Sequence, residues 1–164
     1  MDSTPGAPPP PTQEDIPLAE ELDSLQNSDP QFDPEHFKEI AQDVFFQVQA
    51  GWMRRDLDSY RHLLGEQLAT EYEGHFAEMA QKGQINKLEN IAIRKVEIVD
   101  AGVFGDYEAV TILFTANLLD YTVKENSGEV VEGSMTDPVK FAEKWSWGRP
   151  VGAKEWKLER VETA

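Results

Sequence analysis

Histidine side chains are the first candidates for chemistry, and the chain has three of them, His36, His62 and His75. A metal site would need two or three ligands on neighbouring turns. Glu71 and His75 are four residues apart on a predicted helix, a spacing that allows a hydrogen bond or a weak ion pair. The chain has no cysteine, which excludes disulfides, thiol catalysis and cysteine-ligated metals. We therefore predict no metal site and no cofactor.

Carboxylate and phenol side chains are the second candidates, because together in one cavity they can transfer a proton and stabilise an oxyanion. Asp120 and Tyr121 are adjacent on a predicted strand, so their side chains point to opposite faces of a sheet. Asp106 and Tyr107 lie beside a predicted turn. No acid, base and oxyanion donor fall together by spacing, and we predict that the chain is not an enzyme. A cavity containing a carboxylate with a raised pKa would favour an isomerase-like enzyme instead.

Aromatic side chains recur at the spacing of amphipathic helices and strands, which is typical of a buried core. A second interpretation is that this core is incompletely filled, and that its mouth accepts an acyl chain, a small apolar ligand or a partner's apolar side chains. The sequence does not separate the two, because large aromatics line a pocket as readily as they fill it. The candidate pocket residues are Phe45, Trp52, Tyr72, Phe76, Phe114, Phe141, Trp145 and Trp147.

Three helices are predicted to position the first of these residues. Asp33-Pro34-Glu35 has the residue types of a helix start, with Asp as the N-cap and Pro at the first helical position. An apolar stripe then predicts a helix over 34–53, a short second helix follows, and a third is predicted over 66–82. Phe46 falls off the stripe and is expected to be exposed or to meet a partner. The stripe consists of Phe37, Ile40, Ala41, Val44, Phe45, Val48 and Trp52.

From Lys87 onward the apolar period changes to two, the period of β-strands. A change of phase near Arg94-Lys95 predicts a β-bulge, which would bend the sheet. Residues 101–106 are predicted as a hairpin loop, because they contain two glycines. A long strand is predicted over 107–124, and a further strand begins near Val130.

The last stretch, 137–161, predicts two strands that close the sheet. Phe141, Trp145 and Trp147 share one parity and therefore one face. Lys144 and Arg149 are expected at a solvated edge rather than at an anionic head group. Helices followed by strands indicate an α+β fold, in which N-terminal helices pack in a curved four-stranded antiparallel sheet. Such a cone is cystatin-like or nuclear-transport-factor-like.

Composition is that of one globular domain of 164 residues, with a formal net charge of −16. Nine of the 31 acidic residues, and no lysine or arginine, fall in 1–35. Nucleic-acid binding and unaided binding to anionic lipid need a basic face, so both are disfavoured. The longest uncharged apolar run, 109–119, is shorter than the about 20 residues that cross a bilayer. The chain as given is therefore expected to be soluble.

Residues 1–28 are predicted as a disordered, proline-rich, acidic tail or linker, and residues 29–164 as the folded domain. The Pro8–Pro11 run favours polyproline II, and the acidic stretch after it has too little apolar surface to order itself. A short helix over 18–26 is an alternative within this tail.

An ordered set of short motifs resembles the C-terminal domain of the mitochondrial inner-membrane translocase subunit forty-four family. Within this family the chain resembles the bacterial-type members. The resemblance covers about residues 28–162. It is carried by Asp29-Pro30-Gln31-Phe32-Asp33, Lys87-Leu88-Glu89-Asn90, Glu143-Lys144-Trp145-Ser146-Trp147-Gly148-Arg149 and Trp156-Lys157-Leu158, together with Phe37, Ala41, Phe45, Val48-Gln49, Trp52, Asp56-Leu57, Arg61 and Leu64.

This resemblance implies a non-catalytic scaffold with protein partners in a membrane-associated assembly, as in the protein-import motor. A lipid or acyl chain in the cone, and a homodimer through the sheet, are further expectations. The native protein would be peripheral to, or anchored at, the inner (cytoplasmic) membrane. Bacterial members often carry a membrane-spanning segment before this domain, so this chain is either a soluble member or an excerpt. A basic, amphipathic segment before the domain would favour lipid binding, but segment 1–35 of this chain is acidic.

Overall fold

The computed structural model describes residues 16–164. The proline-rich part of the predicted tail lies outside the described residues. The helices, in chain order, are α1 (Leu18–Ser28), α2 (Pro34–Arg54), η2 (Leu57–Ser59), η3 (Arg61–Leu63) and α3 (Glu66–Lys82). The strands are β1 (Gln84–Phe104), β2 (Tyr107–Lys124), β3 (Val130–Gly133), β4 (Val139–Pro150) and β5 (Lys157–Thr163).

Helix α2 begins where the sequence predicts. The side chain of Asp33 accepts a hydrogen bond from the Glu35 backbone N–H at 3.1 Å, and Pro34 occupies the first turn. The helix ends at Arg54, and the left-handed φ of 52° at the following residue, Arg55, breaks the helical repeat. Most of the apolar stripe is buried, but Trp52 is only half-buried and Ile40 is 38% exposed. The expected burial of the stripe is therefore wrong at Ile40, because this residue lines an open surface groove together with Leu63 and Trp156. Phe46 is exposed, as expected.

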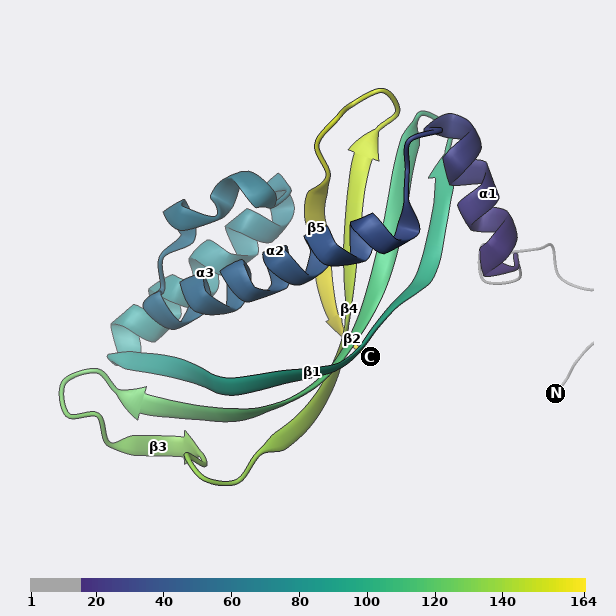
Figure 1. Ribbon diagram of the computed structural model, residues 1–164. Coiled ribbons are helices and arrows are strands. Elements are labelled where there is room, and N and C mark those ends of the chain that lie inside the picture. The colour runs from purple at the N-terminus through teal and green to yellow at the C-terminus, as the bar shows by residue number, and fades with distance from the viewer. Residues whose placement is uncertain (1–15) are drawn as a thin grey trace, which may run out of the picture.

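The sheet is antiparallel and has the order β1-β2-β4-β5, with β3 paired to β2 beyond the end of β4 (Figure 1). The predicted α+β cone is confirmed, with five strands in place of four. The fifth strand is β3, which pairs Gly133 with Tyr121 while β4 pairs only with residues 107–118 of β2. The break at Asp137-Pro138 separates two strands, because proline cannot donate to the ladder.

Register shifts bend β1 along its length. They lie between Glu89 and Ala92, between Ile93 and Lys95, and between Ile98 and Asp100. The second confirms the predicted bulge near Arg94-Lys95. The predicted loop over 101–106 is wrong, because pairing continues to Phe104 against Tyr107 and the turn is only Gly105-Asp106, with a φ of +65° at the glycine. The result is a long, strongly curved hairpin.

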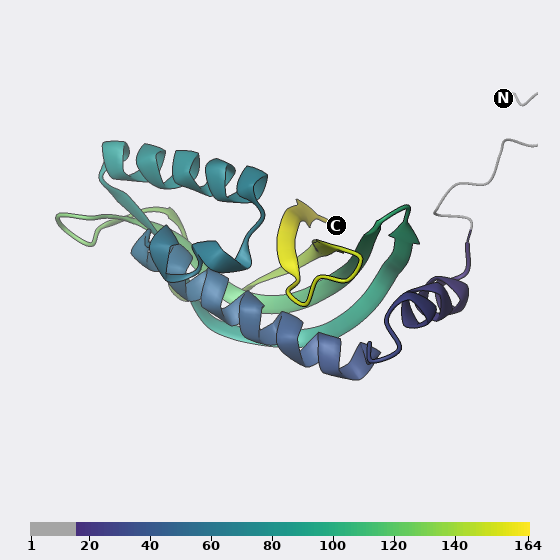
Figure 2. The same cartoon turned by 90° about the horizontal axis from the view of Figure 1, so that it is seen from above.

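Helix α2 lies across the concave face of this sheet, and α3 lies alongside α2 on the same side of the sheet (Figures 1 and 2). The ring of Phe45 packs against Phe114 of β2, with centroids 4.7 Å apart, and against Trp145 of β4 at 5.0 Å. Phe45, Phe114 and Trp145 are each at most 1% exposed. Trp52 of α2 contacts Tyr72 of α3, with ring centroids 5.4 Å apart. The helix stripe and the aromatic strand therefore form one core.

Helix α1 occupies part of the segment predicted as a tail. It packs on β1, and its Leu25 is fully buried in the same core. The predicted disorder therefore does not describe residues 18–28, where the alternative of a short helix is correct. The apolar residues of α1 are sparse, but its contact surface is supplied by the far end of β1 (Figure 1). Because that surface is distant in sequence, local composition did not reveal it.

Candidate functional site

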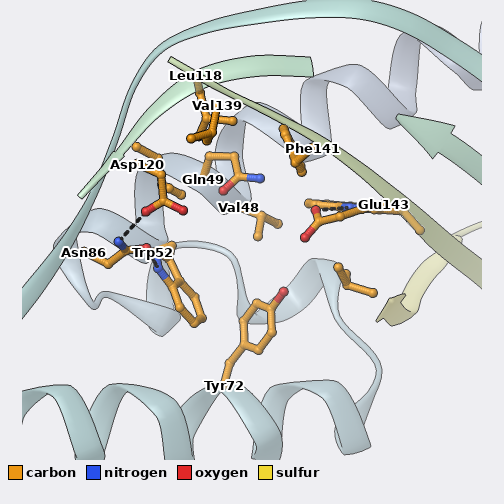
Figure 3. A pocket seen from close by; sticks show the side chains of 13 residues that line it. Val48, Gln49, Trp52, Tyr72, Asn86, Leu118, Asp120, Val139, Phe141 and Glu143 are labelled. Atoms are coloured by element: carbon orange, nitrogen blue, oxygen red, sulfur yellow. Dashed lines mark hydrogen bonds between the residues drawn. The ribbon is translucent and has the colours of Figure 1, made fainter. Parts of the chain in front are cut away.

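A cavity of about 270 Å³ lies inside the cone, between α2, α3 and the concave face of the sheet (Figure 3). Its wall is largely apolar and aromatic, with polar groups on two sides. The lining residues are Val48, Gln49, Trp52, Tyr72, Asn86, Leu88, Leu118, Asp120, Val139, Phe141, Glu143, Trp145 and Val161.

The structure divides the eight predicted pocket residues into two groups of four. Trp52, Tyr72, Phe141 and Trp145 line the cavity together. The others are buried in the core and do not line it: Phe45, Phe76, Phe114 and Trp147. The predicted set therefore contains both core residues and cavity-lining residues. On one face of β4, for example, Phe141 and Trp145 line the cavity, while Trp147 is packed in the core.

One polar side of the cavity is a chain of hydrogen bonds. The indole Nε1 of Trp52 donates to Asn86 Oδ1 at 2.9 Å, and Asn86 Nδ2 donates to Asp120 Oδ1 at 2.9 Å (Figure 3). Asp120 is exposed, so it stands at the mouth. Its neighbour Tyr121 is not part of the lining and donates to Glu89 Oε1 at 2.7 Å. The predicted opposite orientation of Asp120 and Tyr121 is confirmed.

The other polar side is Glu143 on β4. Its Oε1 accepts a hydrogen bond from Trp145 Nε1 at 3.0 Å. Burial raises the pKa of Glu143 above its usual range, while the Trp145 hydrogen bond acts in the opposite direction. Burial also raises the pKa of Tyr72, and the carboxylates of Glu143 and Glu71 add to that rise. Glu143 thus meets the condition set for an isomerase-like enzyme, a carboxylate with a raised pKa in a cavity.

Four polar residues of the lining were not among the predicted pocket residues: Gln49, Asn86, Asp120 and Glu143. Glu143 has the same parity as Phe141 and Trp145, so its position on the inner face was available from the sequence. Asp120 likewise shares the parity of Leu118. No local signal identified Asn86, because it precedes the predicted start of the first strand at Lys87.

No group of three or more His, Asp or Glu side chains that could hold a metal ion occurs within residues 16–164. The histidines are separated: His36 lies in the first turn of α2, His62 lies in η3, and His75 lies on α3 with its ring 5.8 Å from that of Trp52. All three are exposed.

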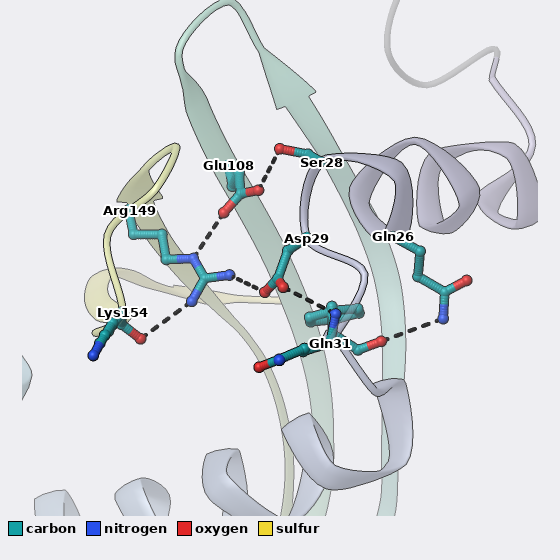
Figure 4. Close-up of polar contacts among 8 residues, drawn as sticks. Gln26, Ser28, Asp29, Gln31, Glu108, Arg149 and Lys154 are labelled. Atoms are coloured by element: carbon teal, nitrogen blue, oxygen red, sulfur yellow. Dashed lines mark hydrogen bonds and ion pairs between the residues drawn. The ribbon is translucent and has the colours of Figure 1, made fainter.

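A second polar cluster lies at the other end of the sheet, centred on Arg149 (Figure 4). Its Nε donates to Glu108 Oε1 at 2.7 Å, its Nη2 to Asp29 Oδ2 at 2.6 Å, and its Nη1 to the Lys154 carbonyl oxygen at 3.1 Å. The guanidinium carbon lies 4.1 Å from the centroid of a Trp156 ring. Arg149 is 7% exposed and Glu108 only 1%. The predicted solvated edge is therefore wrong for Arg149, because the residues that cover it come from distant parts of the chain.

This second cluster fixes the end of α1, and the residue that follows it, to the sheet. Ser28, at the end of α1, donates its hydroxyl to Glu108 Oε2 at 2.6 Å, and Asp29 follows directly. Each charged group is used by an internal partner. The cluster is therefore structural, and the cavity is the candidate functional site.

No helix within residues 16–164 is both long enough and apolar enough to cross a membrane.

Comparison with known proteins gives a family and a fold. The chain matches the family described as the Tim44-like domain over residues 18–163. Its fold is similar to that in the crystal structure of the intermembrane space region of the chloroplast protein ARC6, with a TM-score of 0.50 and 14% sequence identity. That similarity covers 82% of this chain and 100% of the other. A comparison with curated proteins finds no match. The family match includes every helix and strand described above, and this chain therefore belongs to the Tim44-like domain family.

Proposed function

We propose that this chain is a non-catalytic interaction domain that acts as a scaffold in a membrane-associated protein assembly. The observation that carries the proposal is the family match, which extends from the first residue of α1 to the last strand. Tim44-like domains are generally non-catalytic scaffolds, related to proteins of membrane-associated import and assembly. In this proposal the native protein is peripheral to, or anchored at, the inner membrane.

Charge favours a protein partner with a basic surface. The chain has a net charge of −16, which repels anionic lipid and nucleic acid and accelerates association with cationic surfaces. The mouth of the cavity carries Asp120 and the side chain of Val139, which is 46% exposed. An apolar contact rimmed by acidic groups is the type of surface that a basic, amphipathic segment would cover.

Site-specific photocrosslinking in the native host tests this function. A photoreactive residue replaces Val139 at the mouth, and a control replaces Glu97, an exposed residue that pairs with Leu113 on the convex face. We expect the Val139 probe to crosslink to subunits of a membrane-bound complex and the Glu97 probe to do so much less. Adducts only with soluble metabolic enzymes, or equal labelling from both positions, would contradict the proposal.

A second candidate function is the binding of a lipid acyl chain or another small apolar ligand, which the apolar wall of the cavity favours. Native mass spectrometry of the purified chain would show such a ligand as an added mass that Val48→Trp abolishes.

Glu143 supports the isomerase-like alternative, but the family weighs against it. A homodimer through the sheet stays a prediction, and sedimentation equilibrium would test it.

A further inference from the structure

The size of the cavity limits what can enter it. Sites for whole small molecules usually enclose about 300–1,000 Å³, and this cavity encloses about 270 Å³. A lipid with its head group, or a cofactor, would project far beyond the mouth. One long side chain of a partner protein matches the space better.

The charge of the lining is of one sign. Its thirteen residues include two carboxylates, Asp120 and Glu143, and no lysine, arginine or histidine. Figure 3 shows the two carboxylates on different sides of the cavity, with Trp52 and Tyr72 from the two helices facing the space between them. An anionic group placed there would be repelled by both carboxylates, and a low local dielectric strengthens that repulsion.

Glu143 has a hydrogen bond but no ion pair within residues 16–164. Burial raises its pKa because the carboxylate has lost solvent without gaining a cation. A cationic group in the cavity would supply the missing charge, and would hold Glu143 ionised.

The aromatic wall favours the same ligand chemistry. Trp52, Tyr72, Phe141 and Trp145 line the cavity, and the faces of such rings attract ammonium and guanidinium groups. The hydrogen bonds from Trp52 to Asn86 and from Asn86 to Asp120 fix one carboxylate at the mouth. Apolar walls would also accommodate the methylene stem of a long basic side chain.

We propose that the cavity receives a single lysine or arginine side chain from a basic, amphipathic segment of a protein partner, with its charged group between Asp120 and Glu143. This inference rests on the proposed interaction function and specifies its chemistry. The cavity therefore acts as a charge-selective socket that rejects fatty acids and anionic head groups.

Peptide binding to the purified chain tests the proposal. One short amphipathic peptide is labelled and prepared in four versions, with lysine, arginine, norleucine or glutamate at a central position, and fluorescence anisotropy measures the Kd. We expect the lysine and arginine versions to bind at least about tenfold more tightly than the other two. Equal affinity of the lysine and norleucine versions would overturn the proposal in favour of a purely apolar site.

Two variants locate the binding in the cavity. Glu143→Gln and Asp120→Asn should each weaken the lysine peptide about tenfold and leave the norleucine peptide unchanged. Glu97→Gln removes the same charge from the convex face and should leave both unchanged. Circular dichroism confirms that each variant folds, and Asp120 is exposed, so its variant remains informative if Glu143→Gln does not fold. Equal weakening by Glu97→Gln would overturn the proposal, because the preference would then reflect net charge.

The outcomes separate this inference from the proposed function. If the peptides bind equally well whatever their charge, and Val139 still crosslinks to a membrane complex, the inference about the cavity is wrong and the proposed function stands. Charge-selective binding without such crosslinks defeats the proposed assembly and supports the socket. Competition of the lysine peptide by decanoate, but not by hexylamine, would also overturn the inference, because it would show that the cavity prefers an anionic amphiphile.

Discussion

At the scale of single residues, the guanidinium group of Arg149 makes a combination of contacts that a lysine could not make. The three nitrogens of its guanidinium group donate to Glu108, Asp29 and a backbone carbonyl, and the plane of the group lies over the ring of Trp156. A lysine presents one point charge and could not make these contacts together. Glu108 is 1% exposed, so its carboxylate depends on Arg149 for charge compensation.

Replacing Arg149 should therefore cost far more stability than replacing a surface arginine. Arg149→Ala leaves the Glu108 carboxylate buried without a cation, and we expect a loss of about 3–5 kcal/mol in the free energy of unfolding. The control is Arg160→Ala, which removes an exposed pair with Glu162 and should cost about 0–1 kcal/mol. Urea unfolding measures both. Similar losses in the two variants would show that the buried cluster contributes little.

Glu21 on α1 is the residue through which pH should act. Its side chain is 5% exposed and faces the Asp100 carboxyl of β1, with Lys144, Arg160 and Glu162 lining the same groove. Burial first, and then the hydrogen bond and charge of Asp100, raise the pKa of Glu21 to about 7. The folded protein thus holds a proton that the unfolded chain releases near pH 4.5.

Stability should accordingly fall as pH rises from about 4.5 to about 7, because the folded state disfavours ionised Glu21. Glu21→Gln cannot ionise, so we expect it to match the wild type at the lower pH and to exceed it at the higher one. Glu20→Gln, on the exposed side of α1, should retain the wild-type dependence. Thermal melting across this pH range is the measurement, and a parallel curve for Glu21→Gln would contradict the assignment.

At the scale of elements, α2 packs closely against the turn between η2 and η3. Gly51 in the last part of α2 lies against the ring of Tyr60, which is fully buried. A Cβ at position 51 would overlap that ring. The glycine is needed for close approach, although glycine is a poor helix former.

Two helical glycines give a matched test. Gly51→Ala should destabilise the fold by about 1–3 kcal/mol, since Tyr60 must move within a packed core. Gly74→Ala on α3, where a Cβ meets nothing within 4 Å, should stabilise it by up to about 1 kcal/mol through helix propensity. Denaturant unfolding of both variants measures the difference. The two expected changes have opposite signs, and a Gly51→Ala variant as stable as the wild type would refute the close contact.

At the scale of the whole molecule, the curved sheet is closed at one end and open at the other. The Arg149 cluster and α1 close the end near the β1–β2 turn, while the cavity occupies the end near β3 (Figures 1, 3 and 4). We propose that the folded domain begins with α1 rather than at residue 29. The full burial of Leu25 and the Ser28 hydrogen bond to Glu108 support this boundary.

Truncation tests that boundary. A chain of residues 29–164 should be less stable than one of residues 16–164 by at least about 2 kcal/mol. The loss of the buried Leu25 side chain by itself accounts for about that much. Urea unfolding of the two chains, monitored by tryptophan fluorescence, gives the difference. Indistinguishable stabilities would restore the boundary predicted from the sequence.

The sequence by itself determined the elements whose signals are local. The Asp33 cap and the apolar stripe located α2. A long apolar run between two turn signals located β2 from Tyr107 to Lys124. Caps, periods and turns act within a few residues. Only the tertiary structure decided that α1 docks, that Arg149 is buried, and that Trp52 lines a cavity while Phe45 fills the core. Burial depends on which distant segment arrives opposite a side chain, and no pattern within one segment carries that information.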